Sequence, residues 1–94
     1  MTAADPILSR IDGLLARLAA PLPAAERACG WTDASRAAFI TYYTGLRRTL
    51  TASADVDRAA HASIARDLDY WGIVGGELAA EALVIAAALR ARPT

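Results

Sequence analysis

The hydrophobic and polar residues of this chain recur with the spacing of α-helices. In the first pattern, apolar residues fall on one helical arc and polar residues on the other. Asp5 is suited to cap this helix and Pro6 to open its first turn, whereas Pro21 ends it because proline cannot donate to the helical hydrogen bonds. The apolar arc consists of Ile7, Leu8, Ile11, Leu14, Leu15 and Leu18.

Two further helical patterns follow a connector at residues 24–31, in which we expect at most one short helical turn. Thr32 or Asp33 caps a helix that runs to about Leu50. The next helix is predicted from a cap at Ser53 or Asp55 to Gly72. The apolar arc of the first of these helices holds Phe39, Tyr42, Tyr43, Leu46 and Leu50, and that of the second holds Val56, Ala60, Ile64, Leu68 and Trp71.

The last predicted helix, from Glu77 to about Arg92, has two apolar faces. One stripe contains Leu78, Ala82, Ile85 and Leu89, and the other contains Ala80, Leu83, Val84 and Ala87. A helix with two apolar faces needs two surfaces to cover them: one is the rest of this domain, and the other is either more of the same domain or a second chain. We therefore predict self-association through the second stripe. Whether residues 73–76 form a turn or a kink in one continuous helix stays open.

The fold class that these patterns predict is all-α, a small antiparallel bundle of about four helices in a single domain spanning residues 1–94. A chain of 94 residues buries only about 60 to 65% of its unfolded surface, so its margin of stability is thin. Much of its 55% hydrophobic content is alanine, which adds little apolar area per residue. We therefore expect dimerisation to complete the bundle.

Charge and targeting signals narrow the possible partners and locations. All ten basic residues are arginine, ten acidic residues balance them, and no basic run is present, which argues against nucleic-acid binding. The longest nearly apolar stretch, residues 73–89, contains Glu77 and Glu81, so we expect no membrane span. The first residues do not resemble a signal peptide, and Cys29 has no second cysteine to pair with. These features favour a cytoplasmic protein.

Candidate metal ligands are Asp57 and His61, four residues apart on one helical face, and Glu77 with Glu81 on the next helix. If the two helices fold back near residue 74, His61 is about 12 to 16 Å from the glutamates, at a rise of roughly 1.5 Å per residue. The four side chains then form no common site. We therefore expect no metal and no cofactor, and interpret Asp57 and His61 mainly as a surface pair that is only a weak candidate for ligand binding.

The lone histidine, within Ala60-His61-Ala62-Ser63-Ile64-Ala65-Arg66, is similar to the phosphate-accepting histidine of histidine phosphotransfer domains, which are helical bundles of about this size. That family expects a lysine three residues after the histidine and then a glycine. Ile64 and Ala65 stand at these positions. The charge that attracts the phosphoryl group and the space beside the ring are both missing, so we do not assign the chain to that family.

Two other sets of residues could carry chemistry. Tyr42 and Arg47, with their neighbours Tyr43 and Arg48, could bind an anion, although aromatic residues at this spacing are more often core. Cys29 has no base beside it and is interpreted as a buried structural cysteine. No phosphate loop, nucleophile elbow or zinc signature is present in the sequence.

The function predicted from these features is that of a non-catalytic helical protein-interaction module, such as a small regulator, an immunity-like inhibitor or an accessory subunit. It would act as a homo-oligomer that binds a protein partner. The alternative is a small enzyme or ligand-binding subunit with its site around His61 or around Tyr42 and Arg47.

Overall fold

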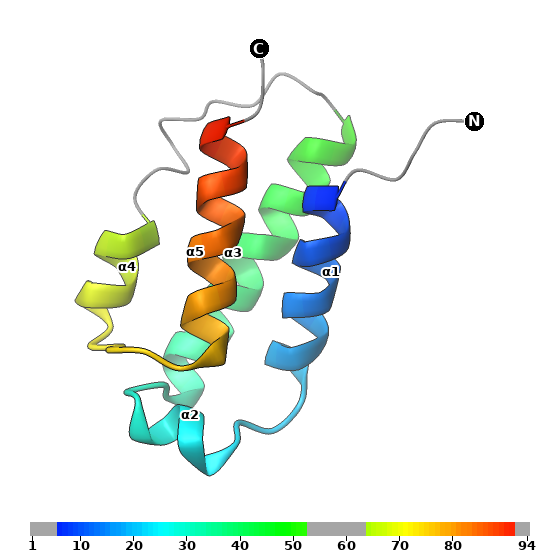
Figure 1. Ribbon diagram of the computed structural model, residues 1–94. Helices are drawn as coiled ribbons and strands as arrows, with labels where there is room; N and C mark the ends of the chain where they lie inside the picture. Colours follow the sequence, from blue (N-terminus) through cyan, green and yellow to red (C-terminus); the bar gives the residue numbers. More distant parts are fainter. Residues whose placement is uncertain (1–5, 53–63, 92–94) are drawn as a thin grey trace.

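The computed structural model describes residues 6–52 and 64–91, and within these ranges every regular element is a helix (Figure 1). The all-α class predicted from the periodicity is therefore confirmed. The first helix ends before Pro21, as predicted, and the connector contains one short helix. The helices are α1 (Pro6–Ala19), α2 (Ala24–Ala28), α3 (Asp33–Ala52), α4 (Ile64–Tyr70) and α5 (Glu77–Ala91).

Helix α1 packs against both α3 and α5, and α4 packs against α5. Helix α1 descends in Figure 1, whereas α3 and α5 both ascend, so α1 runs antiparallel to the two long helices against which it packs. The buried apolar side chains form one continuous cluster between them, because α1, α3, α4 and α5 each turn most of one predicted apolar stripe inward. Among its most completely buried members are Ile11, Leu14, Leu18, Tyr43 and Ile85.

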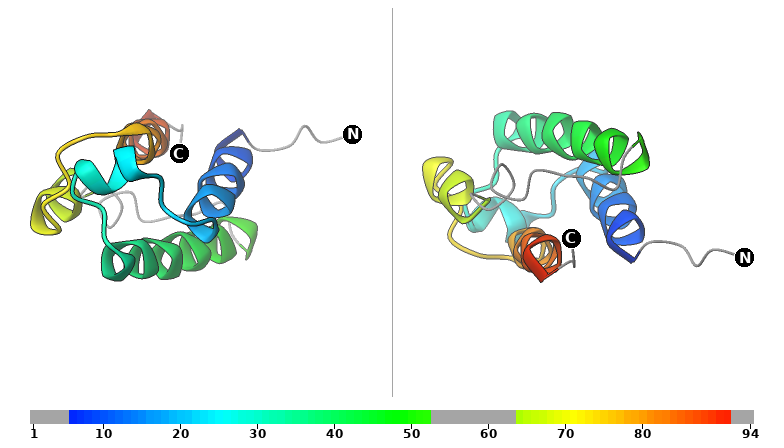
Figure 2. Two further views of the ribbon diagram at one scale, coloured as in Figure 1. Left: turned by 90° about the horizontal axis from the view of Figure 1, so that it is seen from below. Right: turned by 90° about the horizontal axis from the view of Figure 1, so that it is seen from above.

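Helix α2 lies across the end of the molecule at which α1 ends and α5 begins (Figure 2). Two residues after its end, Gly30 adopts a left-handed conformation with φ of 106°. The N–H of Trp31 donates to the carbonyl of Glu26, and the N–H of Gly30 donates to that of Arg27. These two bonds form a Schellman turn, which satisfies carbonyls that the helix itself leaves free.

Helix α4 ends in the same way, at Gly72 with φ of 74°. The N–H of Ile73 donates to the carbonyl of Leu68, and the N–H of Gly72 donates to that of Asp69. This turn separates α4 from α5, which resolves whether the two form one kinked helix. The turn also contacts its counterpart after α2, because the N–H of Val74 donates to the carbonyl of Cys29 at 2.8 Å.

The predicted third helix is described only from Ile64 onward. Ile64 and Leu68 are buried, as their stripe predicts, and half-buried Trp71 follows the end of α4. The predicted caps Ser53 and Asp55 and the positions Val56 and Ala60 lie outside the described residues. The N-cap candidate Asp5 also lies outside them.

Candidate functional sites on α5 and at its amino-terminal end

Helix α5 has a buried face and an exposed apolar face, as its pattern indicates. Opposite the core lie Ala80, Leu83, Val84 and Ala87, which we call the outer strip. Leu83 is 44% exposed and Val84 is 42% exposed. Among the described helices, none has both the length and the hydrophobicity needed to cross a membrane. The core-facing residues are Leu78, Ala79, Ala82, Ile85, Ala86 and Leu89.

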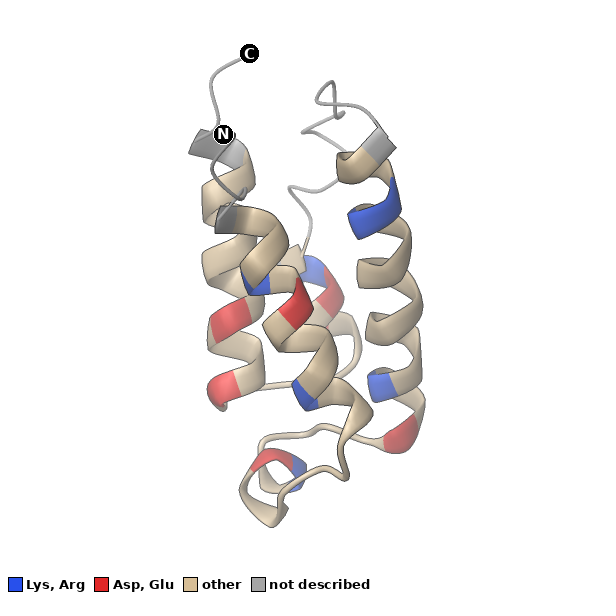
Figure 3. Ribbon diagram, turned by 90° about the vertical axis from the view of Figure 1, so that its right-hand side faces the viewer, with Lys and Arg blue, Asp and Glu red and all other residues tan. Residues whose placement is uncertain are grey.

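The two carboxylates of α5 form ion pairs with α1 rather than a ligand set. Arg17 pairs with Glu77 at 2.8 Å, and Arg10 pairs with Glu81 at 3.1 Å. In Figure 3 the acidic positions of α5 lie beside the basic positions of α1. Asp57 and His61 fall outside the described residues, within which no group of three potential metal ligands is found.

The amino-terminal end of α5 is capped by a side chain from a distant part of the sequence. Gly76 precedes the helix and has no side chain with which to cap it. The Leu78 N–H instead donates to Oε1 of Glu26 at 2.7 Å, across 52 positions. A β-carbon on Gly76 would lie only 2.2 Å from Oε2 of Glu26, so glycine is needed for the carboxylate to approach. Glu26 is 5% exposed, and this bond offsets part of the cost of burying its charge.

A pocket of about 380 Å³ lies beside this cap, between the carboxyl-terminal end of α1, α2 and the start of α5. Glu26 and the Arg17–Glu77 pair supply its charged lining, and alanine, proline and leucine side chains supply most of the remainder. Cys29 also lines the pocket and is partly exposed. The interpretation of Cys29 as a fully buried residue is therefore corrected: its position at the end of a short surface helix leaves one side open to the pocket.

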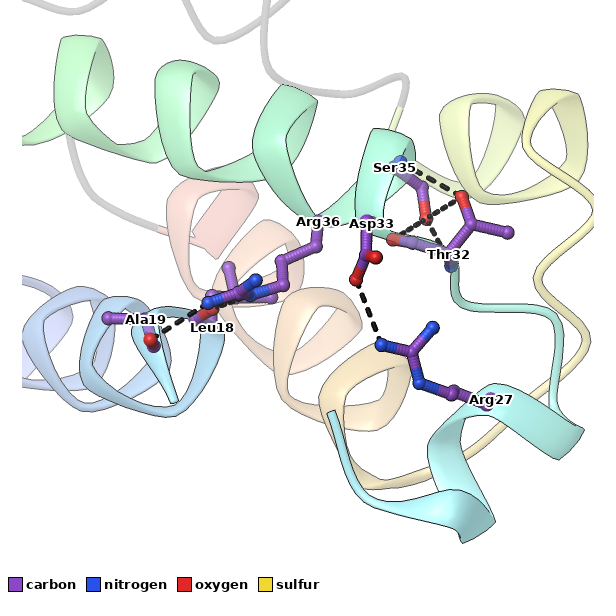
Figure 4. A network of polar contacts seen from close by, with 7 residues as sticks. All are labelled: Leu18, Ala19, Arg27, Thr32, Asp33, Ser35 and Arg36. Carbon is purple, nitrogen blue, oxygen red and sulfur yellow. Dashed lines mark hydrogen bonds and ion pairs between the residues drawn. The ribbon is translucent and has the colours of Figure 1, made fainter. Parts of the chain in front are cut away.

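Polar contacts around α3 hold this end of the molecule together (Figure 4). The hydroxyl of Thr32 accepts from the Ser35 N–H at 3.1 Å, and the Ser35 hydroxyl accepts from the Thr32 N–H at 2.9 Å. This reciprocal capping box identifies Thr32 as the N-cap of α3. The guanidinium of Arg36 donates to the carbonyls of Leu18 and Ala19 and so caps the carboxyl-terminal end of α1. Figure 4 also shows the ion pair that joins Arg27 on α2 to Asp33 at the start of α3.

The structure does not bring Tyr42 and Arg47 together. Arg47 pairs with Asp12 on α1, and this contact raises the pKa of its guanidinium. Tyr42 instead lines a small hollow of about 180 Å³ with Phe39, Asp67 and other residues. Burial, and secondarily the charge of Asp67, raises the pKa of Tyr42 to about 12. Tyr42 and Arg47 are five residues apart, or roughly 140° around the helix axis, so their side chains face different neighbours.

Glu26 and Arg36 are the residues with a positioning role that sequence reasoning missed. Two glycines, Gly75 and Gly76, precede α5 and have no side chain that could cap it, which indicates that the cap comes from another part of the chain. Nothing in the sequence identifies Glu26 as its source. Arg36 has no local signal either, because it acts on carbonyls 17 and 18 residues away.

The chain matches no protein-family model, no curated protein and no solved structure.

Proposed function

We propose that the protein is a non-catalytic helical interaction module, a small regulator, inhibitor or accessory subunit, that forms a homodimer through the outer strip of α5 and binds a protein partner. The observation that supports this proposal is the exposure of Leu83 and Val84 on the side of α5 opposite the core. All four residues of the outer strip are apolar. Such a surface is stabilised when another apolar surface covers it.

The order of residues in the outer strip favours a second copy of this chain as the occupant. The strip reads small, large, large, small in Ala80, Leu83, Val84 and Ala87. A two-fold axis that passes between Leu83 and Val84 would place each terminal alanine opposite the other alanine of the partner copy. The strip is therefore complementary to itself in an antiparallel pair, as a two-fold interface requires. In this arrangement α5 of each copy completes the helical bundle of the other.

The partner-binding part of the proposal rests on Tyr70 and Val74. Tyr70 is 81% exposed and Val74 is 84% exposed, the highest values among the large apolar side chains of the described residues. Exposed aromatic side chains are typical of the central parts of protein interfaces. We propose that these two residues, at and just after the end of α4, contact the partner protein.

Sedimentation velocity over a range of concentrations tests the dimer. We expect Leu83→Glu to be monomeric yet folded, because a carboxylate buried without a partner in a dry interface costs several kcal/mol. Ala37→Glu, on the exposed surface of α3, is the matched control and should associate as the wild type does. A wild type that stays monomeric at high concentration would contradict the proposal, as would a Leu83→Glu variant whose circular dichroism shows unfolding.

Cross-linking tests the antiparallel arrangement in particular. In a Cys29→Ser background, chains with Ala80→Cys and chains with Ala87→Cys should form a mixed disulfide when combined. Each variant alone should cross-link poorly, because equivalent positions lie apart at the two ends of the strip. Efficient cross-linking of Ala80→Cys with itself would indicate a parallel pair and rule out the antiparallel arrangement.

A further inference from the structure

The pocket at the amino-terminal end of α5 has the size and lining of a site for a small molecule. Its volume of about 380 Å³ lies within the range of roughly 300 to 1,000 Å³ that is usual for ligand pockets. Ala20, Pro21, Pro23 and Ala25 form apolar walls, and Leu78 contributes a larger apolar surface at the start of α5. None of these residues belongs to the outer strip.

The carboxylate of Glu26 supplies the pocket with an unsatisfied acceptor. Oε1 accepts the Leu78 N–H, whereas Oε2 has no hydrogen-bond partner among the described residues. Oε2 lies against Gly76, another residue of the pocket lining, since a β-carbon on Gly76 would be 2.2 Å from it. Glu26 is only 5% exposed and lines the pocket, so a ligand would reach this oxygen from the pocket.

Among the three charged residues that line the pocket, Glu26 supplies the net negative charge. Arg17 is paired with Glu77 at 2.8 Å, so these two side chains neutralise each other at the rim. Helix N-termini usually attract anions, but here Glu26 already occupies the Leu78 N–H. A second anion would meet a carboxylate, whereas a hydrogen-bond donor with a positive charge would meet its complement.

We propose that this pocket binds a small organic ammonium ion, with its NH₃⁺ group donating to Oε2 of Glu26 and its apolar body against the alanine, proline and leucine walls. No residue of the outer strip lines the pocket, so Leu83→Glu should leave binding of the ammonium ion unchanged.

Benzylammonium is a suitable probe, with benzyl alcohol and benzoate as neutral and anionic comparators of the same ring. Binding is measured from shifts of backbone amide signals, and from the rate at which iodoacetamide alkylates Cys29, which shares the pocket. We expect benzylammonium to bind with a Kd on the order of 1 mM or tighter. The alcohol should bind at least about tenfold more weakly, since charge-assisted bonds are the stronger ones. Saturating benzylammonium should slow alkylation of Cys29.

Two variants make the test specific. Glu26→Gln retains an oxygen for the Leu78 N–H but removes the charge, and should reduce benzylammonium affinity to that of benzyl alcohol. Ala25→Leu leaves the carboxylate in place and fills the pocket from its wall, so it should abolish binding of both probes. Equal affinity for the three probes, absence of saturable benzylammonium binding, or binding that survives Ala25→Leu would each overturn the proposal. The last variant keeps it testable even where Glu26→Gln does not fold.

Discussion

Gly30 packs with its α-carbon directly against the carbonyl group of Gly72. A β-carbon at position 30 would lie 2.2 Å from the carbonyl oxygen of Gly72 and 3.0 Å from the carbonyl carbon. Both atoms belong to the backbone, so no side chain can rotate away. Glycine is thus needed at position 30 for two reasons, its positive φ and the closeness of a second chain segment.

Replacing these glycines by alanine should separate the two reasons. We expect Gly30→Ala to lower the free energy of unfolding by at least about 2 kcal/mol, because strain and overlap add. Gly72→Ala should cost only about 1 to 2 kcal/mol, since its φ is positive but the space around its β-carbon is open. Urea unfolding followed by circular dichroism measures both.

Gly13→Ala is the control for this series. Gly13 lies inside α1, and nothing is found within 4 Å of an added β-carbon. Alanine there should stabilise the protein by roughly 0.5 to 1 kcal/mol. A Gly30→Ala variant as stable as Gly72→Ala would show that the two turns do not pack as described.

Removing the carboxylate that caps α5 should destabilise the fold. Glu26→Ala leaves the Leu78 N–H without its acceptor, at a cost of about 1 to 3 kcal/mol. Glu26→Gln retains an oxygen and should cost clearly less. The control is Glu77→Gln, where an 86% exposed side chain loses its ion pair, and the change should stay below about 1 kcal/mol. Equal effects of Glu26→Ala and Glu77→Gln on urea unfolding would refute this role of Glu26.

Arg36 should tolerate lysine poorly. Its guanidinium reaches two carbonyls at the end of α1, and a lysine ammonium does not reproduce that planar geometry. Arg36→Lys should therefore lower stability by about 1 to 2 kcal/mol. Arg27→Lys, in an exposed ion pair with Asp33, should change it by less than about 0.5 kcal/mol. The prediction fails if thermal unfolding of the two variants is indistinguishable.

Stability should fall at alkaline pH because of the buried phenols. Burial raises the pKa of Tyr42 to about 12, and burial with the neighbouring phenol and carboxylates raises the pKa of Tyr43 further. Between about pH 10 and the folded pKa values, the unfolded chain binds fewer protons than the folded one, so unfolding becomes easier as pH rises. The contribution of the two protonated phenols to the free energy of unfolding is fully present below about pH 10.

Urea unfolding at a series of pH values from about 8 upward checks this sign. Tyr42→Phe removes one of the two groups and should flatten the decline. An unfolding free energy that stays constant or rises above about pH 10 would contradict the burial of Tyr43 in the core and of Tyr42 at its edge.

Periodicity predicted the parts of the fold that depend on one helix at a time. The buried positions of α1 are Ile7, Ile11, Leu14 and Leu18, and all four belong to the predicted arc. The outward direction of Leu83 and Val84 was also visible in the sequence, because it follows from their angle to the Leu78 stripe. Whether the outer strip is an interface stays a prediction.

The pairings between distant segments were not predictable, because helical periodicity describes directions and not neighbours. Glu77 and Glu81 have a spacing that suits metal ligands, yet each meets an arginine of α1. For residues 73–76 the sequence allowed a turn or a kink and indicated no neighbour, whereas Ile73 is buried and the Val74 N–H donates to the carbonyl of Cys29. The pocket is formed by the same contacts between distant segments. Its carboxylate, Glu26, lies in α2, and a helix of five residues is too short to show a hydrophobic period.

The bond between the Val74 N–H and the Cys29 carbonyl also has a kinetic consequence. The chain between these two positions includes all of α3 and α4, so forming this bond costs the entropy of closing a long loop. The Glu26–Leu78 bond closes nearly the same loop and forms at little further entropic cost. The amides of Val74 and Leu78 should therefore exchange their hydrogens with solvent in one common opening event, as a single cooperative unit rather than as two independent turns.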